Sequence, residues 1–250
     1  KQEIVLGIGG ARLLQILGFR VRKYHLNEGH ASLLTLELLN HHRLSVEDTW
    51  DERDSWDTRR VQDKCVFTTH TPVEAGHDRF PYELVERIMG EVIPNDLLQE
   101  LGGKDELNMT RLALNLSHFV NGVAKKHGQV SQALFPGFEI HAITNGIHPF
   151  TWGSPYMMTL FDKYLPGWAN EPELLVRVDI IPDEEIEDAH AGAKAYLFQY
   201  IDEVTGVKFD PELLTIGFAR RATANKRANM NFSDPALLKK IGDGKLQLVF

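Results

Sequence analysis

The chain has 250 residues, of which 43% are hydrophobic and 25% are charged, and a formal net charge of −8. This length and composition are typical of a globular protein with one large or two smaller domains, and a negative charge without a basic run argues against a nucleic-acid partner. Cys65 is the single cysteine, which excludes an internal disulfide framework and fits a reducing cytoplasm, and no apolar run has the length of a membrane span.

Residues 1–19 are predicted to form a helix, because their apolar residues follow helical rather than alternating spacing. Gly7, Gly9 and Gly10 resemble a phosphate-binding loop. However, Arg12 occupies the position of the third glycine of the dinucleotide motif, and no strand precedes it. We therefore expect a helix whose glycines allow close packing on a neighbour and which ends at Gly18.

Residues 20–39 are predicted to form a strand, a polar loop over 27–30 and a periodic helix. His25, Glu28 and His30 could be read as metal ligands. On a helix, however, the two histidines would point about 140° apart, and neither zinc-binding His/Glu motif is present. We predict no metal site here, and expect these residues to bind a polar ligand or to cap the helix with Asn27.

The segment from Cys65 to Phe67 is predicted to be a buried strand that opens into a polar loop over residues 68–77. Open α/β sheets bind ligands at the carboxyl edge of their strands, so His70, Glu74 and His77 lie where a site is expected. A polar turn after a core strand is the alternative interpretation. Cys65, at the start of this strand, is expected to be structural and unreactive.

A buried helix and then a further strand with a polar loop are predicted next in the chain. Residues 108–123 contain apolar residues at helical spacing up to Val120, which predicts a buried helix. Residues 139–143 then predict a short strand, followed by a polar loop over 144–149 that contains Asn145. This is the third polar loop after a strand, and three such loops suggest one shared crevice, although three independent turns would also fit.

After Pro149 the sequence predicts a crossover region, a helix from Pro182 to Gly206 and a strand over 213–218. The cations that follow this strand, Arg220, Arg221, Lys226 and Arg227, predict an anion site, with a solvated basic turn as the alternative. One more helix, capped by residues 233–235, precedes a strand over 246–250. Because a core strand is an unusual terminus, we expect this chain to be an internal piece of a longer protein.

The polar segments together closely resemble those of the α-glucan phosphorylases, the family of glycogen, starch and maltodextrin phosphorylases, and most of all its shorter bacterial and archaeal branch. Five ordered motifs, which run over essentially the whole chain, carry the resemblance: 25–30, 67–72, 120–124, 143–149, and 217–221 with 226–227. The resemblance implies an α/β fold of the GT-B type, in which two Rossmann-like domains face a crevice. Residues 1–149 would then be part of the N-terminal domain, and residues 150–250 the crossover helices and the start of the C-terminal domain.

The resemblance also implies a function: phosphate-dependent release of glucose 1-phosphate from α-1,4-glucan ends, with retention of configuration and with pyridoxal phosphate as cofactor. It implies a homo-oligomer whose partners are glucan and phosphate, without nucleic acid or membrane. The residues expected at the site fall into three groups: catalytic His70, Arg221 and Lys226; substrate-binding Glu28, Asn145 and Glu74; cofactor-binding Lys226 and Arg220. Fixed donors and cations suit a reaction that develops positive charge on a sugar and negative charge on phosphate.

Two departures from the family pattern stand out. Asn225 occupies the position, just before Lys226, at which the family usually has an aromatic residue. The lysine that forms the Schiff base with pyridoxal phosphate belongs to a later segment and has no counterpart here, so the chain by itself is expected to be inactive. Two other functions remain open: a retaining glycosyltransferase that uses a sugar nucleotide, and a non-catalytic glucan-binding module.

Overall fold

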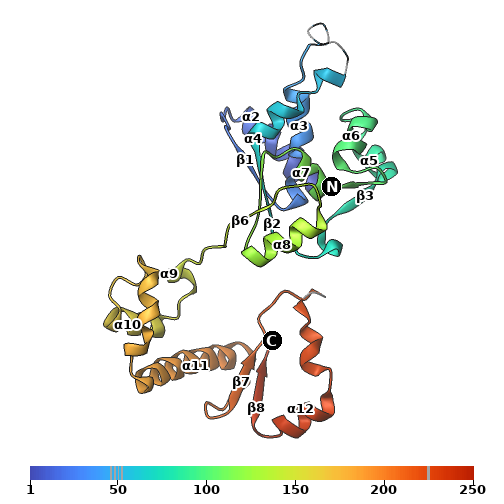
Figure 1. Cartoon of the computed structure of the whole chain (residues 1–250). Helices are drawn as coiled ribbons and strands as arrows, with labels where there is room; N and C mark the ends of the chain where they lie inside the picture. The colour runs from blue at the N-terminus through green and yellow to red at the C-terminus, as the bar shows by residue number, and fades with distance from the viewer. Residues whose placement is uncertain (46, 48, 50, 52, 224–225) are drawn as a thin grey trace. The chain divides into compact units, whose positions relative to one another are not determined.

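The structure is a computed structural model that describes residues 1–45, 47, 49, 51, 53–223 and 226–250. It divides into two compact units, Lys1–Gly146 and Ile147–Phe250 (Figure 1). Each unit has a hydrophobic core of its own. Among the described residues, no helix combines the length and the apolar character needed to cross a membrane.

The first unit is built on a parallel sheet of four strands in the order β1-β2-β5-β6. The strands are β1 (Tyr24–Asn27), β2 (Cys65–Thr69), β5 (Phe119–Gly122) and β6 (His141–Ala142). Leu26, Cys65 and Phe67 are completely buried, as expected for strands covered on both faces by helices. The predicted α/β class with a parallel sheet is confirmed.

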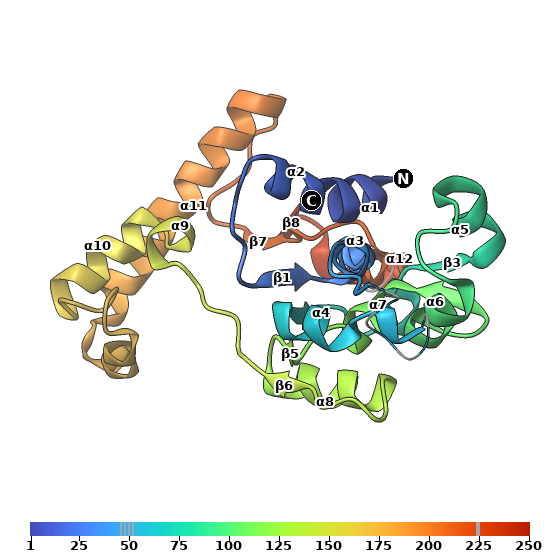
Figure 2. The ribbon, with the colours of Figure 1, turned by 90° about the horizontal axis from the view of Figure 1, so that it is seen from above.

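Helices and a small two-stranded sheet surround this parallel sheet. The main helices of the unit are α3 (Leu34–His41), α4 (Thr58–Lys64), α5 (Tyr82–Met89), α6 (Asn95–Gly102), α7 (Met109–Asn115) and α8 (Lys125–Leu134). An antiparallel pair, β3 (Arg79–Pro81) with β4 (Glu106–Asn108), lies beside α5 and α6. Figure 2 shows α8 next to β5 and β6, where it covers that side of the sheet.

The predicted N-terminal helix is confirmed, with a π-helical turn inside it. It consists of α1 (Gln2–Ile4), the π-helical segment η1 (Val5–Gly9) and α2 (Gly10–Ile16). Gly18, at a φ of 77°, follows its end. Gly7 packs directly on the start of α3: a Cβ placed there would lie 2.8 Å from the Leu34 nitrogen and 3.0 Å from the Leu33 Cβ. The close packing expected from the glycines is therefore present.

Two substitutions in this helix are expected to have opposite effects on stability. Gly7→Ala would force its Cβ into the backbone of α3, and we expect a loss of about 1–3 kcal/mol. Gly10→Ala would meet no atom within 4 Å and should gain about 0.5–1 kcal/mol from the better helix propensity of alanine. Urea unfolding of the two variants measures both effects. Equal midpoints would show that Gly7 is not needed for close packing.

The prediction of one buried helix over residues 108–123 is wrong. Helix α7 ends at Asn115, and Phe119–Gly122 forms strand β5 in the sheet. The apolar residues Phe119 and Val120 fit helical spacing, but they are also a short β-prone run, which periodicity alone does not distinguish from a helix. Parallel pairing with β2, in which Val120 lies opposite Phe67, decides in favour of the strand.

The second unit contains most of the remaining predicted elements. It includes α9 (Pro149–Trp152), α10 (Pro155–Tyr164), the 3-10 segment η6 (Pro172–Ile180), α11 (Asp183–Thr205), β7 (Leu214–Gly217), η8 (Ala228–Phe232), α12 (Pro235–Gly242) and β8 (Leu246–Val249). Strands β7 and β8 form a parallel pair. The core of the unit lies where α10 packs on α11, around Leu160, Leu165, Trp168 and Ile181.

The ends of two helices in this unit follow the sequence signals. Helix α11 begins after Pro182 with three acidic residues in its first turn, and Gly206 ends it in the left-handed conformation. The Asp234 side chain accepts a hydrogen bond from the Leu237 amide and caps α12. Lys163 and the Tyr164 hydroxyl of α10 both bond to Glu185 of α11, which adds polar contacts to this helix pair.

Candidate active site

The polar loops gather at one edge of the parallel sheet. Strands β1, β2, β5 and β6 all run in the same direction, so their carboxyl ends lie together. Backbone hydrogen bonds continue past the strand ends: the Glu28 amide donates to the Thr68 carbonyl at 2.9 Å, and the Asn145 amide donates to the Val123 carbonyl at 3.1 Å. The loop after β1 is therefore joined directly to β2, and the loop after β6 to the segment after β5. They form one polar edge, where ligands of open α/β sheets bind.

Glu28 has an unusual backbone at this edge. Its φ is 64° and its ψ is 175°, a conformation that is almost restricted to glycine and costs about 1–3 kcal/mol for other residues. Strain of this kind is found mainly at functional sites, where the surrounding contacts hold it in place.

The side chain of Glu28 reaches across to the loop after β2. Its Oε1 accepts a short hydrogen bond from the backbone amide of His70 and another, at 2.9 Å, from the Thr71 hydroxyl. Glu28 and His70 are separated by 42 residues in sequence, and the pairing of β1 with β2 brings them together. These are the two predicted site residues that the structure links directly.

A row of polar side chains crosses three neighbouring strands, β1, β2 and β5, just below this edge. The Thr68 hydroxyl donates to Asn121 Oδ1 at 2.9 Å and lies 2.8 Å from His25 Nε2. A hydroxyl has one hydrogen, so Thr68 accepts from His25, and His25 carries its proton on Nε2. Thr68 and Asn121 are buried, and this row holds β1, β2 and β5 in register. This row was not predicted, although polar residues in otherwise apolar strands, such as Thr68 and Asn121, are a signal for it.

The other predicted residues of this unit differ in their surroundings. His70 is half-buried, and Asn145 is exposed in the loop after β6. Glu74 lies on a short 3-10 turn, Glu74–Gly76, and its Oε1 accepts a hydrogen bond from Arg79 at 2.7 Å. The Glu74 side chain is 71% exposed. Glu74 thus has an ionic partner in its own loop, whereas Glu28 and His70 are bonded to each other.

His77 is a buried residue, although its place in the polar loop suggested a site residue. It is 6% exposed, its Nδ1 lies 2.8 Å from the Thr110 hydroxyl, and its ring packs edge-to-face on Phe135. Burial lowers the pKa of His77 by disfavouring the charged imidazole, and the nearby Glu28 carboxylate partly offsets this. We infer that His77 anchors the end of the loop that carries His70.

One group of potential metal ligands lies close to this loop. Donor atoms of Glu3, His30 and Asp78 all lie within 4.8 Å of one another, and His30 Nδ1 is 3.1 Å from Asp78 Oδ2. This group has no signature in the sequence, because it is assembled from α1, the 3-10 turn Gly29–Ala31 and the loop before β3. His25, which was considered as a ligand with His30, contacts Thr68 instead. The three side chains are partly or largely exposed, and His30 and Asp78 already form a pair.

Cys65 lies at the start of β2 and is completely buried. Burial raises the pKa of its thiol to about 12, and the opposing effect of Lys23 and Lys64 is smaller. The reactive thiolate is therefore almost absent at neutral pH.

We expect Cys65 in the native protein not to react with a thiol reagent, and its labelling to appear only on unfolding. Titration of the thiol with a chromogenic disulfide, in buffer and in guanidinium chloride, measures this. The denatured sample is the control, because it must yield the single thiol of the chain. Rapid labelling of the native protein with loss of activity would contradict the structural role.

The basic segment of the second unit follows β7. Arg220 and Arg221 are exposed, and Lys226 is half-buried with its amide donating to the Thr223 carbonyl at 3.0 Å. Asn225, which replaces the usual aromatic residue, lies outside the described residues. These cations follow the carboxyl end of a strand in a parallel pair, which is the position of phosphate sites in open α/β sheets.

A hollow of about 560 Å³ opens beside this segment within the second unit. Its walls come from one side of α11 and from the carboxyl ends of β7 and β8, including Lys194, Phe218, Ala219 and Phe250. The Lys194 ammonium donates to the Leu213 carbonyl at 2.9 Å, so it fixes α11 to the start of β7. The volume is in the range of small-molecule sites, about 300–1,000 Å³.

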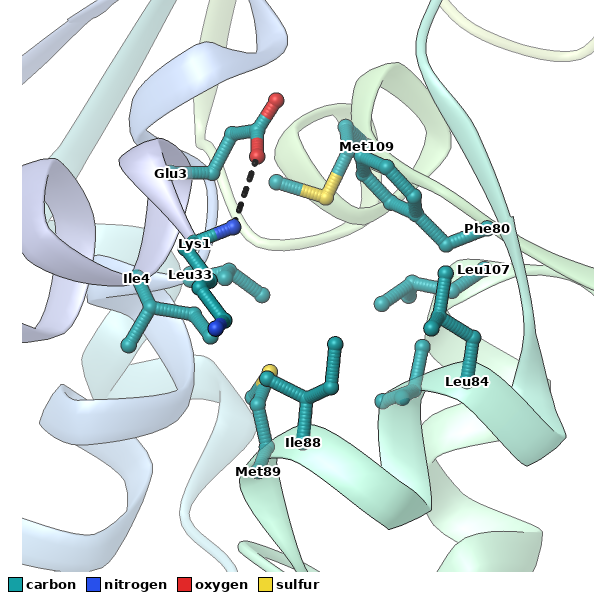
Figure 3. A pocket seen from close by; sticks show the side chains of 11 residues that line it. Lys1, Glu3, Ile4, Leu33, Phe80, Leu84, Ile88, Met89, Leu107 and Met109 are labelled. Carbon is teal, nitrogen blue, oxygen red and sulfur yellow. Dashed lines mark ion pairs between the residues drawn. The ribbon is translucent and has the colours of Figure 1, made fainter.

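A second hollow, in the first unit, does not fit a sugar or a phosphate. Figure 3 shows apolar side chains around it, with Lys1 and Glu3 from the start of the chain at one side. Its volume is about 70 Å³, and most of its walls come from α5, the β3–β4 pair and neighbouring helices: Ile4, Leu33, Phe80, Leu84, Val85, Ile88, Met89, Leu107 and Met109. It is a small gap in the apolar packing.

Comparison with known proteins found no matching family model. Among curated proteins, the chain is 36% identical to a maltodextrin phosphorylase of Thermococcus litoralis, over 96% of this chain and 32% of that protein. It is 33% identical to a glycogen phosphorylase of Mycobacterium tuberculosis, over 96% and 33%. It is 31% identical to a glycogen phosphorylase of Aquifex aeolicus, over 100% and 41%. The chain thus spans about a third to two-fifths of the length of these relatives.

Proposed function

We propose that the protein that contains this chain is an α-1,4-glucan phosphorylase. The premise is that the chain is, by sequence, a relative of the α-glucan phosphorylases. It would release glucose 1-phosphate from the non-reducing ends of glucan, with inorganic phosphate and with retention of configuration. The observation that carries this proposal is the similarity to maltodextrin and glycogen phosphorylases along nearly the whole chain. The strained, hydrogen-bonded edge around Glu28 and His70 supports it, because strain collects at functional sites.

In this proposal the fold is of the GT-B type. The first unit, with its parallel sheet, supplies part of the N-terminal domain and the sugar-binding edge. The second unit supplies the crossover helices and the start of a C-terminal Rossmann-like domain, of which the parallel pair β7 and β8 would be the first strands. Residues 1–149 and 150–250 are the corresponding domain assignments.

In this proposal, His70 and Asn145 bind the sugar that reacts. Cleavage of the glycosidic bond develops positive charge on the sugar ring, and donors that are held rigidly cost no reorganisation as the charge forms. His70 follows the central strand, and its backbone is fixed through Glu28, so it is suited to hold a sugar hydroxyl. Asn145 would bind hydroxyls from the neighbouring loop, and Glu74, once released from Arg79, could add an acceptor.

In this proposal, Arg221 and Lys226 bind the substrate phosphate. Arginine offers a planar fork for two phosphate oxygens, and lysine a point charge. Arg220, Arg221 and Lys226 form a donor set that fits a phosphate group, and Lys226 with Arg220 would hold the phosphate of pyridoxal phosphate. When bound, that cofactor supplies a phosphate group for proton exchange with the substrate phosphate. Arg220, Arg221 and Lys226 would hold the substrate phosphate and the cofactor phosphate close together despite their repulsion. A proton could then move between the two phosphates.

The direct test uses the full-length protein with a linear maltooligosaccharide. We expect α-glucose 1-phosphate to form only when phosphate is added, and the purified protein to show the near-ultraviolet absorbance of bound pyridoxal phosphate. Two controls separate the other candidates. Transfer from a sugar nucleotide without phosphate would point to a glycosyltransferase of that class, and glucan binding without either reaction would point to a binding module.

A further inference from the structure

One carboxylate oxygen of Glu28 is already occupied in the folded protein. An ionised carboxylate only accepts hydrogen bonds, and each of its oxygens offers two lone pairs. Oε1 of Glu28 accepts from the His70 amide and from the Thr71 hydroxyl, so both of its lone pairs are used within the protein. Bonds of this kind to a charged acceptor are about twice as strong as those between neutral groups.

The backbone of Glu28 is strained in a way that serves these bonds. A residue with a φ of 64° and a ψ of 175° is disfavoured unless surrounding contacts compensate. Here the Glu28 amide is bonded to the Thr68 carbonyl of β2 at 2.9 Å, and Gly29 packs tightly on Met109 and Thr110 of α7. The strained residue is thus held on both sides, and its side chain crosses from the end of β1 to the loop after β2.

We propose that Glu28 is a positioning residue, which holds the backbone of His70 and the side chain of Thr71 in the geometry needed at the sugar. This inference rests on the function proposed above, because it assigns to Glu28 a role that acts through His70. Thr71 shares in it, since its hydroxyl supplies the second donor. A change at residue 28 should therefore affect the reaction by moving His70.

Three variants of the full-length enzyme separate this role from simple stabilisation of the fold. Glu28→Gly removes the carboxylate but also relieves the backbone strain, so it keeps the fold. Glu28→Gln keeps an acceptor oxygen on a side chain of the same length, so its kcat should stay close to that of the wild type. Glu83→Gln changes an exposed acid in the first turn of α5, outside the site, and serves as the matched control.

Two measurements carry the test. In Glu28→Gly we expect hydrogen exchange at the His70 amide to become at least ~10-fold faster, because a hydrogen bond to a charged group is lost. We expect kcat to fall by about 100-fold with little change in the KM for glucan, as for a displaced catalytic group. In a His70→Ala background, Glu28→Gly should lower kcat further by less than about threefold, because both substitutions remove the same contribution of His70.

The opposite results would overturn the proposal. A raised KM for glucan at unchanged kcat, with unaltered exchange at His70, would make Glu28 a direct sugar ligand. Additive effects of Glu28→Gly and His70→Ala would show that Glu28 does not act through His70. If the wild-type protein released no glucose 1-phosphate, the proposed function would fail, whereas hydrogen exchange at the His70 amide would still decide whether Glu28 holds this loop.

Discussion

Replacement of His70 by alanine should lower the turnover of the full-length enzyme by about 100-fold, with a much smaller effect on glucan affinity. The reason is its place directly after the central strand β2, on a backbone that Glu28 fixes. A donor held at a reacting sugar strengthens its contact in the transition state, so its loss appears in kcat rather than in KM.

Steady-state phosphorolysis of a maltooligosaccharide at saturating phosphate separates the two parameters. The matched control is His41→Ala, which changes an exposed histidine at the end of α3 and should leave both parameters unchanged. If His70→Ala keeps its kcat and shows only a weaker KM, then His70 contributes uniform binding, and its proposed role at the sugar is wrong.

Arg221→Lys is expected to weaken the binding of substrate phosphate by about 2–4 kcal/mol, which is the free energy of a charge-assisted contact in a closed site. The positive charge is kept, but a lysine cannot reproduce the two-pronged contact of arginine with phosphate oxygens. Lys226→Ala should weaken phosphate binding as well, and should also loosen pyridoxal phosphate, because Lys226 is assigned to both anions.

Phosphate titration of both variants, with spectroscopic measurement of the retained cofactor, checks this pair of expectations. Arg177→Lys and Lys240→Ala provide matched controls in the same unit, since both side chains are exposed and lie on other elements, η6 and α12. Wild-type phosphate dependence and full cofactor content in both site variants would identify residues 220–227 as a solvated basic turn.

Much of the fold could be predicted because local signals agreed with tertiary contacts. The strand that begins at Cys65, the N-terminal glycine-containing helix and the helix between Pro182 and Gly206 each had a clear pattern and clear ends. The exception was residues 108–123, where Phe119 and Val120 continued a helical pattern by spacing alone. Their strand state depends on β2, which lies more than 40 residues away in sequence, and no local signal contains that information.

The candidate site was predictable in outline but not in its contacts. Parallel strands with polar ends had to place Glu28, His70 and Asn145 at one edge of the sheet, and the structure has this arrangement. The bond from His70 to Glu28 depends on the register of β1 against β2 and on a strained φ, neither of which the sequence displays. For the same reason the burial of His77 against Phe135 could not be inferred from its polar neighbours.

The position of β2 in the middle of its sheet has a consequence for synthesis on the ribosome. β1 precedes β2 in the chain and can pair with it early, but Phe67 must wait for Val120, roughly 50 residues later, to pair on its other side. At about 5–20 residues per second, this interval lasts roughly 3–10 s. During that time one edge of Cys65–Thr69 has unpaired amides and carbonyls beside an apolar surface, which is a template for pairing with other chains. While residues 70–120 are being made, this open edge of β2 is exposed to misassembly, and a chaperone that binds then would protect it.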